Sequence, residues 1–393
     1  MNRLLIGAIA IALGTASAGA QSLDDLNIQV HGYATQGFLY TTQNNIFTTS
    51  SSDGSPAWTE AVVNVGAQPI PKLRIGVQAR YFLLGNFGNA ITLDWAAGDY
   101  KFDDRFGVRF GKVKTPSGLF NEVQDIDPSY MWSLLPQSIY PITSRNGNLA
   151  HYGGVVYGTV GLQQAGKLEY RAWGGERKIA GDDGYWISFV ESGITIPNGI
   201  GGPIYGGALH WKAPLRGLML GASYAHNNNW SSTFVDTYVV PAGPSTGVTI
   251  TTPGNYLLSK SNTPDFFGQY EKDKVTFAAE YQRLSGSLLF QGLSPAQKYD
   301  IPSWFAMGSY KLTGKLTGGV YVSQDIDRAT ALGPSRYSKD WTVSGRYDFG
   351  QYVYAKAEEH FINGTSVGYD TDLNLHGLKP DTKLTIFKIG VSF

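Results

Sequence analysis

Cysteine is absent from the 393-residue sequence. Its absence excludes a disulfide-stabilised scaffold, an iron–sulfur protein and a zinc site built on thiolates. Charged residues make up only 16%, and 31 Lys and Arg balance 31 Asp and Glu. No excess of one sign therefore supports a disordered chain or a nucleic-acid partner. Beyond residue 20 no apolar run approaches the roughly 18 residues that a membrane-spanning helix requires.

Glycine and aromatic residues are abundant. The chain has 49 Gly and 24 Tyr, and aromatic residues reach 13%. A sequence poor in charge and rich in Gly and Tyr is typical of many strands joined by tight turns, or of a barrel in lipid.

The first twenty residues, 1–20, have the pattern of a secretory signal peptide. Arg3 precedes an apolar run over Leu4–Leu13, and small residues lead up to Ala20. The run is too short to cross a bilayer, which takes about 20 residues. We expect cleavage after Ala20, export from the cytoplasm and a single mature domain over 21–393, as in a bacterial envelope protein.

Alternation of polar and apolar residues with a period of two recurs along the mature chain, whereas helical periodicity is nearly absent. The pattern predicts sixteen strands, most of them about ten residues long, which is the length of a tilted membrane-spanning strand. The expected strands are Leu26–Thr41, Trp58–Ala67, Leu73–Phe82, Ala90–Phe102, Arg105–Lys114, His151–Val160, Lys167–Gly174, Pro203–Lys212, Leu218–Asn227, Thr263–Glu271, Val275–Arg283, Pro302–Leu312, Lys315–Gln324, Tyr337–Asp348, Tyr352–Phe361 and Lys383–Phe393.

The connections between these strands alternate in length. Those after even-numbered strands are short, and those after odd-numbered strands are mostly long, except Leu83–Asn89. The longest, Thr115–Ala150, follows the fifth strand. This segregation predicts an all-β, transmembrane antiparallel barrel with short periplasmic turns and long external loops.

The two faces of the strands fit a barrel in lipid. Over 73–81, apolar residues alternate with Arg74, Gln78 and Arg80, so we expect the apolar face toward lipid and the polar face toward a wet lumen. Aromatic residues near strand ends are expected to form interface girdles: Tyr40, Trp58, Trp95, Trp211, Tyr224, Trp304 and Trp341.

The last strand carries a resemblance to a known family. Lys383–Phe393 reads K-L-T-I-F-K-I-G-V-S-F and ends on an aromatic with alternating apolar positions behind it. It resembles the C-terminal assembly signal of bacterial outer-membrane barrels, and the whole layout resembles the sixteen-stranded porins. Gly111–Glu122 resembles the strand-to-loop junction of porin-like proteins that often lack an assigned substrate. The acidic P-E-F-G-G-D loop sequence of the enterobacterial general porins is missing, which leaves subfamily and selectivity open.

The resemblance implies a third loop folded into the lumen, a homotrimer in the outer membrane, contacts with the bilayer and lipopolysaccharide, and no cofactor. It implies passive diffusion of small hydrophilic solutes and ions through a water-filled pore. A substrate-selective channel for a sugar, an organic acid or an anion is the alternative within transport. Outside transport, an outer-membrane enzyme and a structural or adhesive barrel also stay open.

Charged residues on the expected lumen face and in the third loop are the candidate pore-lining and constriction residues. We expect a basic wall opposite loop acids, whose transverse field would orient dipolar solutes. The candidates are Arg74, Arg80, Arg105, Arg109, Glu122, Asp125 and Asp127. The alternative that these charges only pair with neighbours remains open, and Asp94 is a candidate partner for one arginine. Within the loop, 130–135 is expected to form a helical turn with its apolar side on the inner wall.

One sequence feature hints at an enzyme. Gly364–Gly368 matches G-x-S-x-G, and His360 lies nearby. In hydrolases this motif joins a strand to a helix, but no amphipathic helix follows it here, so a Gly-rich turn is the favoured interpretation. We expect no catalytic residue. The histidines are scattered without an H-E-x-x-H motif, and we expect no metal site.

Overall fold

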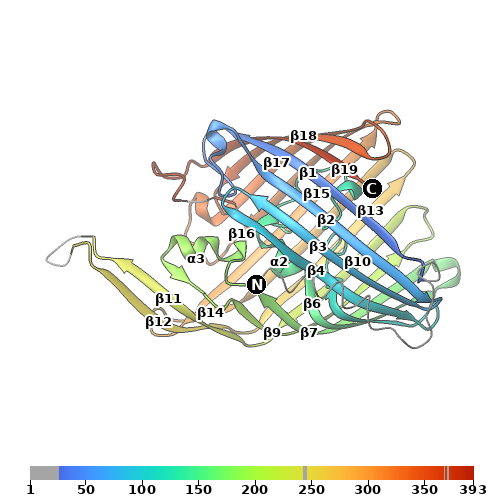
Figure 1. Cartoon of the computed structure of the whole chain (residues 1–393), viewed down its shortest axis with the longest axis horizontal. Helices are drawn as coiled ribbons and strands as arrows, with labels where there is room; N and C mark the ends of the chain where they lie inside the picture. Colours follow the sequence, from blue (N-terminus) through green and yellow to red (C-terminus); the bar gives the residue numbers. More distant parts are fainter. Residues whose placement is uncertain (1–25, 242–245, 367, 370) are drawn as a thin grey trace.

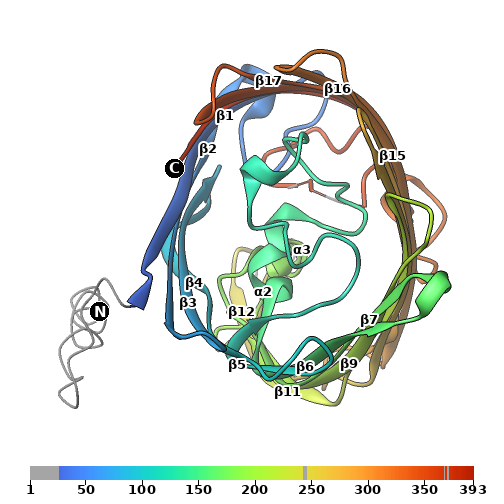
Figure 2. The ribbon, with the colours of Figure 1, turned by 90° about the vertical axis from the view of Figure 1, so that its right-hand side faces the viewer.

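The computed structural model describes residues 26–241, 246–366, 368–369 and 371–393. The predicted signal peptide, 1–20, lies outside the described residues. Sixteen strands form the wall of one closed antiparallel barrel, as predicted (Figures 1 and 2). They are β1 (Gln29–Thr41), β2 (Ser55–Ile70), β3 (Leu73–Leu84), β4 (Phe87–Lys101), β5 (Gly107–Lys114), β6 (Ala150–Gly161), β7 (Lys167–Ile179), β9 (Ile200–Lys212), β10 (Leu218–Asn227), β13 (Ser261–Lys272), β14 (Val275–Phe290), β15 (Gln297–Lys311), β16 (Leu316–Ile326), β17 (Tyr337–Asp348), β18 (Val353–Gly364) and β19 (Asp381–Ser392).

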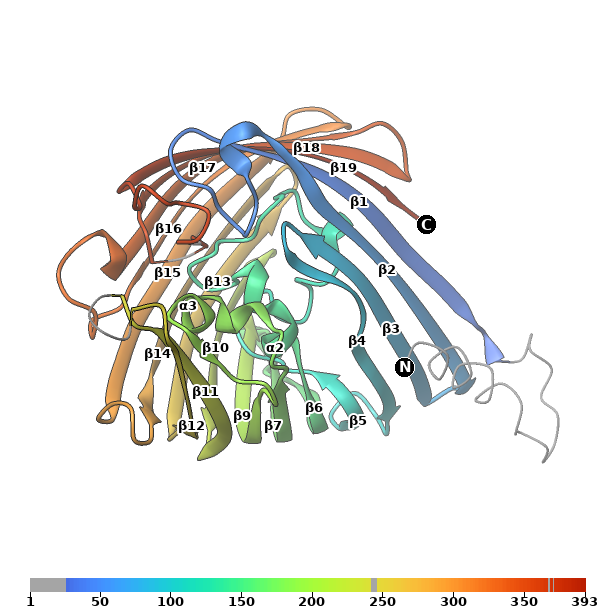
Figure 3. The same ribbon diagram turned by 60° about the vertical axis from the view of Figure 1, so that its left-hand side comes forward.

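The barrel closes between its first and last strands. β1 and β19 pair antiparallel from Tyr33 opposite Ser392 to Thr41 opposite Leu384. Phe393 adds a reciprocal pair of backbone hydrogen bonds with Gly32, at 3.0 and 3.1 Å. The wall strands cross the barrel at a slant (Figure 3). Closure leaves no open strand edge between the chain ends, as a barrel in lipid requires.

Two expected loops contain more strand than the sequence predicted. β14 continues to Phe290 and β15 begins at Gln297, so the expected loop 284–301 shrinks to 291–296. The small polar residues there obscure the alternation, yet their backbones continue the β14–β15 ladder. The expected loop 228–262 contains a hairpin of β11 (Trp230–Val239) and β12 (Thr249–Leu258), which projects from the barrel (Figure 1). A short strand, β8 (Ile194–Thr195), pairs with β11.

Helices are few and short. The α-helices of the described residues are α2 (Arg145–Leu149) and α3 (Ile187–Glu191). Within the described part of the chain, none has the length and apolar character to cross a membrane.

The strand faces follow the predicted alternation along β3. Ile75 on the outer face is 48% exposed, whereas Gln78 and Arg80 are buried on the inner face. Of the expected girdle residues, Tyr40, Trp304 and Trp341 do lie exposed.

The girdle prediction was wrong for two tryptophans. Trp58 is 1% exposed and lies under the Lys388 ammonium, which is 3.9 Å from its ring centre. It shares the inner face with Glu60, two residues away on β2. A register shift of the β3–β4 ladder at Asp94 brings Trp95 to the inner side, where Lys114 approaches its ring. A single bulge of this kind re-aims every later side chain of a strand.

The third loop on the long-loop side, residues 115–149, lies inside the barrel and is called L3 below (Figure 2). Its inward position confirms the prediction. The expected helical turn over 130–135 is wrong, because the turn forms earlier, as a 3-10 helix over Asp127–Ser129. The apolar residues of that segment nevertheless pack on the inner wall: Met131, Trp132 and Leu135 join Phe305 of β15 and Tyr321 of β16 in one buried cluster.

Candidate pore and its constriction loop

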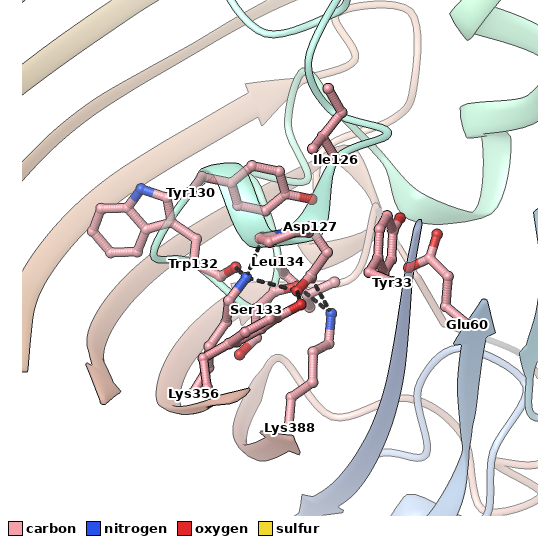
Figure 4. A network of polar contacts seen from close by, with 12 residues as sticks. Tyr33, Glu60, Ile126, Asp127, Tyr130, Trp132, Ser133, Leu134, Lys356 and Lys388 are labelled. Atoms are coloured by element: carbon pink, nitrogen blue, oxygen red, sulfur yellow. Dashed lines mark hydrogen bonds and ion pairs between the residues drawn. The ribbon is translucent and has the colours of Figure 1, made fainter. Parts of the chain in front are cut away.

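The middle of L3 is fixed to the wall by a buried ion-pair cluster (Figure 4). Asp127 is 1% exposed and lies between Lys356 of β18 and Lys388 of β19, at 2.9 and 2.8 Å. Burial alone would raise the pKa of Asp127, but the two ammonium groups outweigh burial and hold it well below its usual range. We call Asp127, Lys356 and Lys388 the latch.

Backbone oxygens complete the latch. Lys356 donates to the carbonyls of Asp127 and Trp132, and Lys388 donates to the carbonyl of Ser133. The Tyr354 hydroxyl donates to the Asp127 carboxylate at 2.7 Å. Both buried ammoniums are thus satisfied by L3, which fixes the path of the loop along β18 and β19.

A carboxylate on β18 supports the next turn of L3. Glu358 accepts hydrogen bonds from the backbone amides of Ser133 (2.6 Å) and Leu134 (3.1 Å). His360 lies behind it, with one ring nitrogen 3.2 Å from Glu358 and the other 2.9 Å from Asp340. The arrangement orients Glu358 toward the loop.

The two arms of L3 reach other parts of the wall. The first arm comes before Asp127 of the latch in the chain, and the return arm comes after it. On the first arm, the Gly118 amide donates to Ser223 Oγ of β10 at 3.0 Å. On the return arm, the Tyr140 hydroxyl lies 2.7 Å from both oxygens of Glu280 on β14. Further on, Arg145 makes a two-pronged ion pair with Asp94 of β4, at 3.0 and 2.8 Å. L3 therefore touches the wall on several sides of the lumen.

The structure separates the four arginines of the expected basic wall. Arg80 is buried and pairs with Glu60 at 2.5 Å. Arg74 and Arg109 lie on either side of Asp99, each directly opposite it in the ladder. Arg74 precedes Arg80 by six residues on β3, so this group lies about 20 Å closer to the tight turns than Arg80 does. Arg105 lies in the exposed turn before β5. They form no continuous patch.

The three loop acids face bases through direct ion pairs. Glu122 pairs with Arg109 at 3.2 Å and with Arg171 of β7 at 3.4 Å. Asp125 is fully buried beside Lys114, at 2.7 Å. Asp127 belongs to the latch. Asp94, the expected partner of a wall arginine, pairs instead with Arg145 of L3.

Sequence reasoning missed Arg145 and Lys388 as anchors of L3. Arg145 lies in the loop itself, where no alternation marks its direction. Lys388 shares the inner face of β19 with the buried Ile386, a position that the period of two could have pointed to.

Cavities lined by both polar and apolar side chains lie on the two sides of the first arm of L3. Toward the long loops, a cavity of about 480 Å³, called the upper cavity below, is lined by Ser117, Asn121 and Gln124 of L3, by wall residues of β7, β10 and β13 to β16, and by residues of the β11–β12 hairpin. Toward the tight turns, another of about 360 Å³ is lined by Glu122 of L3 and by residues that include Arg74. The arm between 117 and 124 is therefore the candidate constriction.

The G-x-S-x-G serine is not joined to the nearby histidine. Ser366 donates to Asp325 at 2.6 Å, whereas His360 contacts Asp340 and Glu358. Among the described residues, no hydrogen bond links the Ser366 and His360 side chains, and no group of three metal-ligating side chains is present.

A closed barrel of sixteen antiparallel strands with the loop after its fifth strand held inside is the fold of the bacterial porins. Solved structures bear this out at low sequence identity. OmpF of Salmonella typhi, in complex with daunomycin, is 12% identical with a TM-score of 0.59, over 95% of this chain and 99% of that one. OmpT of Vibrio cholerae is 12% identical with a TM-score of 0.57, over 95% and 100%. The anion-selective porin of Comamonas acidovorans is 10% identical with a TM-score of 0.58, over 93% and 99%.

These likenesses establish the porin fold of the chain. No protein-family model matches the sequence, and no curated protein matches it. OmpT of Vibrio cholerae has also been solved in a trimer form.

Proposed function

We propose that the protein is an outer-membrane porin that gives small hydrophilic solutes and ions a passive route through a water-filled pore. The observation that carries the proposal is the first arm of L3, held inside the barrel with a cavity of mixed polar and apolar lining on each of its sides. Diffusion through such a pore needs width, wet walls and a charge pattern, but no chemistry. We expect no catalytic residue and no cofactor.

The charges at the constriction support weak selectivity between ions. Glu122 lies between Arg109 and Arg171, and these two bases are balanced further by Asp99 and Glu169. Asp125 and Lys114 cancel each other in the same way. Paired charges leave a small net field, which admits both cations and anions of modest size.

The mature protein, 21–393, is proposed to be exported behind a cleaved signal peptide and to assemble as a homotrimer among outer-membrane lipids and lipopolysaccharide. An apolar outer face, with residues such as Ile75 and Trp341 exposed, supports insertion in lipid.

Conductance of the refolded mature protein in a planar bilayer tests the proposal. Steady openings are expected, in groups of three steps for a trimer, and the reversal potential in a salt gradient should be small. A folded barrel that inserts and stays silent would overturn the pore and leave a structural or adhesive barrel.

A further inference from the structure

One arginine beside the upper cavity has no acidic partner. Arg177, on the inner face of β7, is 8% exposed, and it lines the cavity of about 480 Å³. Its Nη2 donates to Thr115 Oγ1 at 3.2 Å and to the Asn148 carbonyl at 3.4 Å, and its Nε has no partner. Among the described residues, no carboxylate lies within ion-pair distance of it.

The other two buried arginines show what is missing. Arg80 pairs with Glu60, and Arg145 pairs with Asp94. A buried guanidinium without a counter-charge is costly, because the desolvation of the charge is not repaid. Arg177 therefore presents the cavity with an unneutralised positive charge, and an anion that enters would supply the absent partner.

The acids of the same cavity are not near this arginine. Asp325 is the penultimate residue of β16 and Asp327 follows the strand, and both line the cavity. Five wall strands, β9, β10, β13, β14 and β15, lie between β16 and β7. The part of the cavity around Arg177 is therefore the positive part.

An apolar wall adjoins the positive charge. Ile179 follows Arg177 on the same face of β7, and Tyr185, Trp230 and Leu258 line the same cavity. These side chains pack in or against one apolar cluster formed by β7, β9, β11, β12, β14 and the loop 180–199. We call Arg177 and these four residues the recess.

We propose that the recess is a binding subsite for small organic carboxylates with an apolar body. The guanidinium would take the carboxylate in a charge-assisted hydrogen bond, and the aromatic and aliphatic side chains would cover the hydrocarbon part. A neutral sugar lacks the charge, and inorganic phosphate lacks the apolar body. The inference rests on the proposed function, since it names a solute class for the same pore.

Calorimetry in detergent, with benzoate as the probe, tests the subsite without requiring conduction. Benzamide has the same shape without the charge, and inorganic phosphate has charge without the ring. Binding of benzoate well above both is expected. Absence of benzoate binding, or equal binding of benzamide, overturns the proposal, and equal binding of phosphate overturns its apolar part.

Three variants locate the binding. Arg177→Gln should weaken benzoate binding about tenfold, the value of one charge-assisted hydrogen bond. Arg177→Lys should keep most of it. Lys178→Gln is the matched control, because Lys178 is 63% exposed at the next position of β7, on its opposite face, and should change nothing. Unchanged benzoate binding in Arg177→Gln overturns the assignment of the subsite to Arg177. If Arg177→Gln fails to fold, Arg177→Lys decides, because a tenfold loss of binding in that variant would contradict the role of the positive charge.

Conductance separates this inference from the proposed function. In plain potassium chloride the wild-type channel should conduct, and benzoate should then block it in a concentration-dependent way. A conducting barrel that does not bind benzoate overturns the subsite alone. A silent barrel that binds benzoate overturns the pore and leaves the subsite standing.

Discussion

The latch gives the sharpest test of how L3 is held. Asp127→Asn keeps the size of the side chain and removes the negative charge between Lys356 and Lys388, which are 2.9 and 2.8 Å away. Breaking a buried ion pair by removing one partner costs about 3–5 kcal/mol. Because three backbone carbonyls still accept from the two lysines, we expect the lower value, and a population of released L3 about 150-fold higher.

Limited proteolysis measures that population. Chymotrypsin should cut at Tyr130 or Trp132 only when the loop leaves the wall, so cleavage of Asp127→Asn should be faster by about the same factor. Asp300→Asn is the matched control, because Asp300 pairs with two exposed arginines at the rim and should contribute little. Equal cleavage of wild type and Asp127→Asn, or an equal effect of the control, would refute the reasoning.

The latch also sets a dependence on pH. Because the pKa of Asp127 is lowered in the folded protein, its contribution to stability is complete above the unfolded value of about 3.9. This contribution is lost only as the pH falls below the unfolded pKa and through the lowered pKa of the folded protein. Release of L3 should therefore be unchanged from about pH 7 to about pH 5 and increase only in stronger acid, where chymotrypsin is inactive and hydrogen exchange corrected for its intrinsic rate is the measurement.

Three further predictions concern other parts of the lumen. Burial raises the pKa of Asp183 to about 6, so the contribution of Asp183 to the stability of loop 180–199 is complete below about pH 3.9 and is lost as the pH rises through 6. Protection of the loop amides, measured by hydrogen exchange corrected for the intrinsic rate at each pH, should be higher at pH 5 than at pH 8, and Asp183→Asn should abolish the difference. Glu358→Ala leaves two buried L3 amides unpaired and should destabilise the loop by at least about 2 kcal/mol, which faster proteolysis of L3 would show. Glu358→Gln keeps an oxygen that can accept, so it should destabilise the loop less. Glu122→Gln removes one acid shared by Arg109 and Arg171, which keep Asp99 and Glu169 as partners, so the reversal potential should shift toward anion selectivity, and no shift would place Glu122 outside the ion path.

The sequence predicted the barrel well because its signals are local. Alternation with a period of two and the segregation of loop lengths each depend on neighbouring residues only, and they marked all sixteen wall strands. The same alternation fails where a bulge intervenes, as at Asp94, where Trp95 turns inward. It also fails where small polar residues continue a ladder, as between β14 and β15.

The candidate site was less accessible from the sequence because its contacts span the barrel. The partners in the latch are more than 220 positions apart in the chain, and no local pattern pairs Asp127 with Lys388. Arg74, Arg80 and Arg109 were expected in the lumen because of their strand face, but the partners of the lumen charges depend on the path of L3. Arg177 stands out only when the absence of a carboxylate around it can be checked in three dimensions.

The central claim is that solutes pass beside the first arm of L3, and the absence of cysteine makes this directly measurable. A Gln124→Cys variant places a thiol on the L3 side of the upper cavity, and a positively charged methanethiosulfonate reagent can be added during single-channel recording. Asp273→Cys, in the exposed turn between β13 and β14, is the control. The account predicts a stepwise fall in current for Gln124→Cys and none for the control. A current that the modified loop leaves unchanged, or a barrel that never conducts, would contradict it.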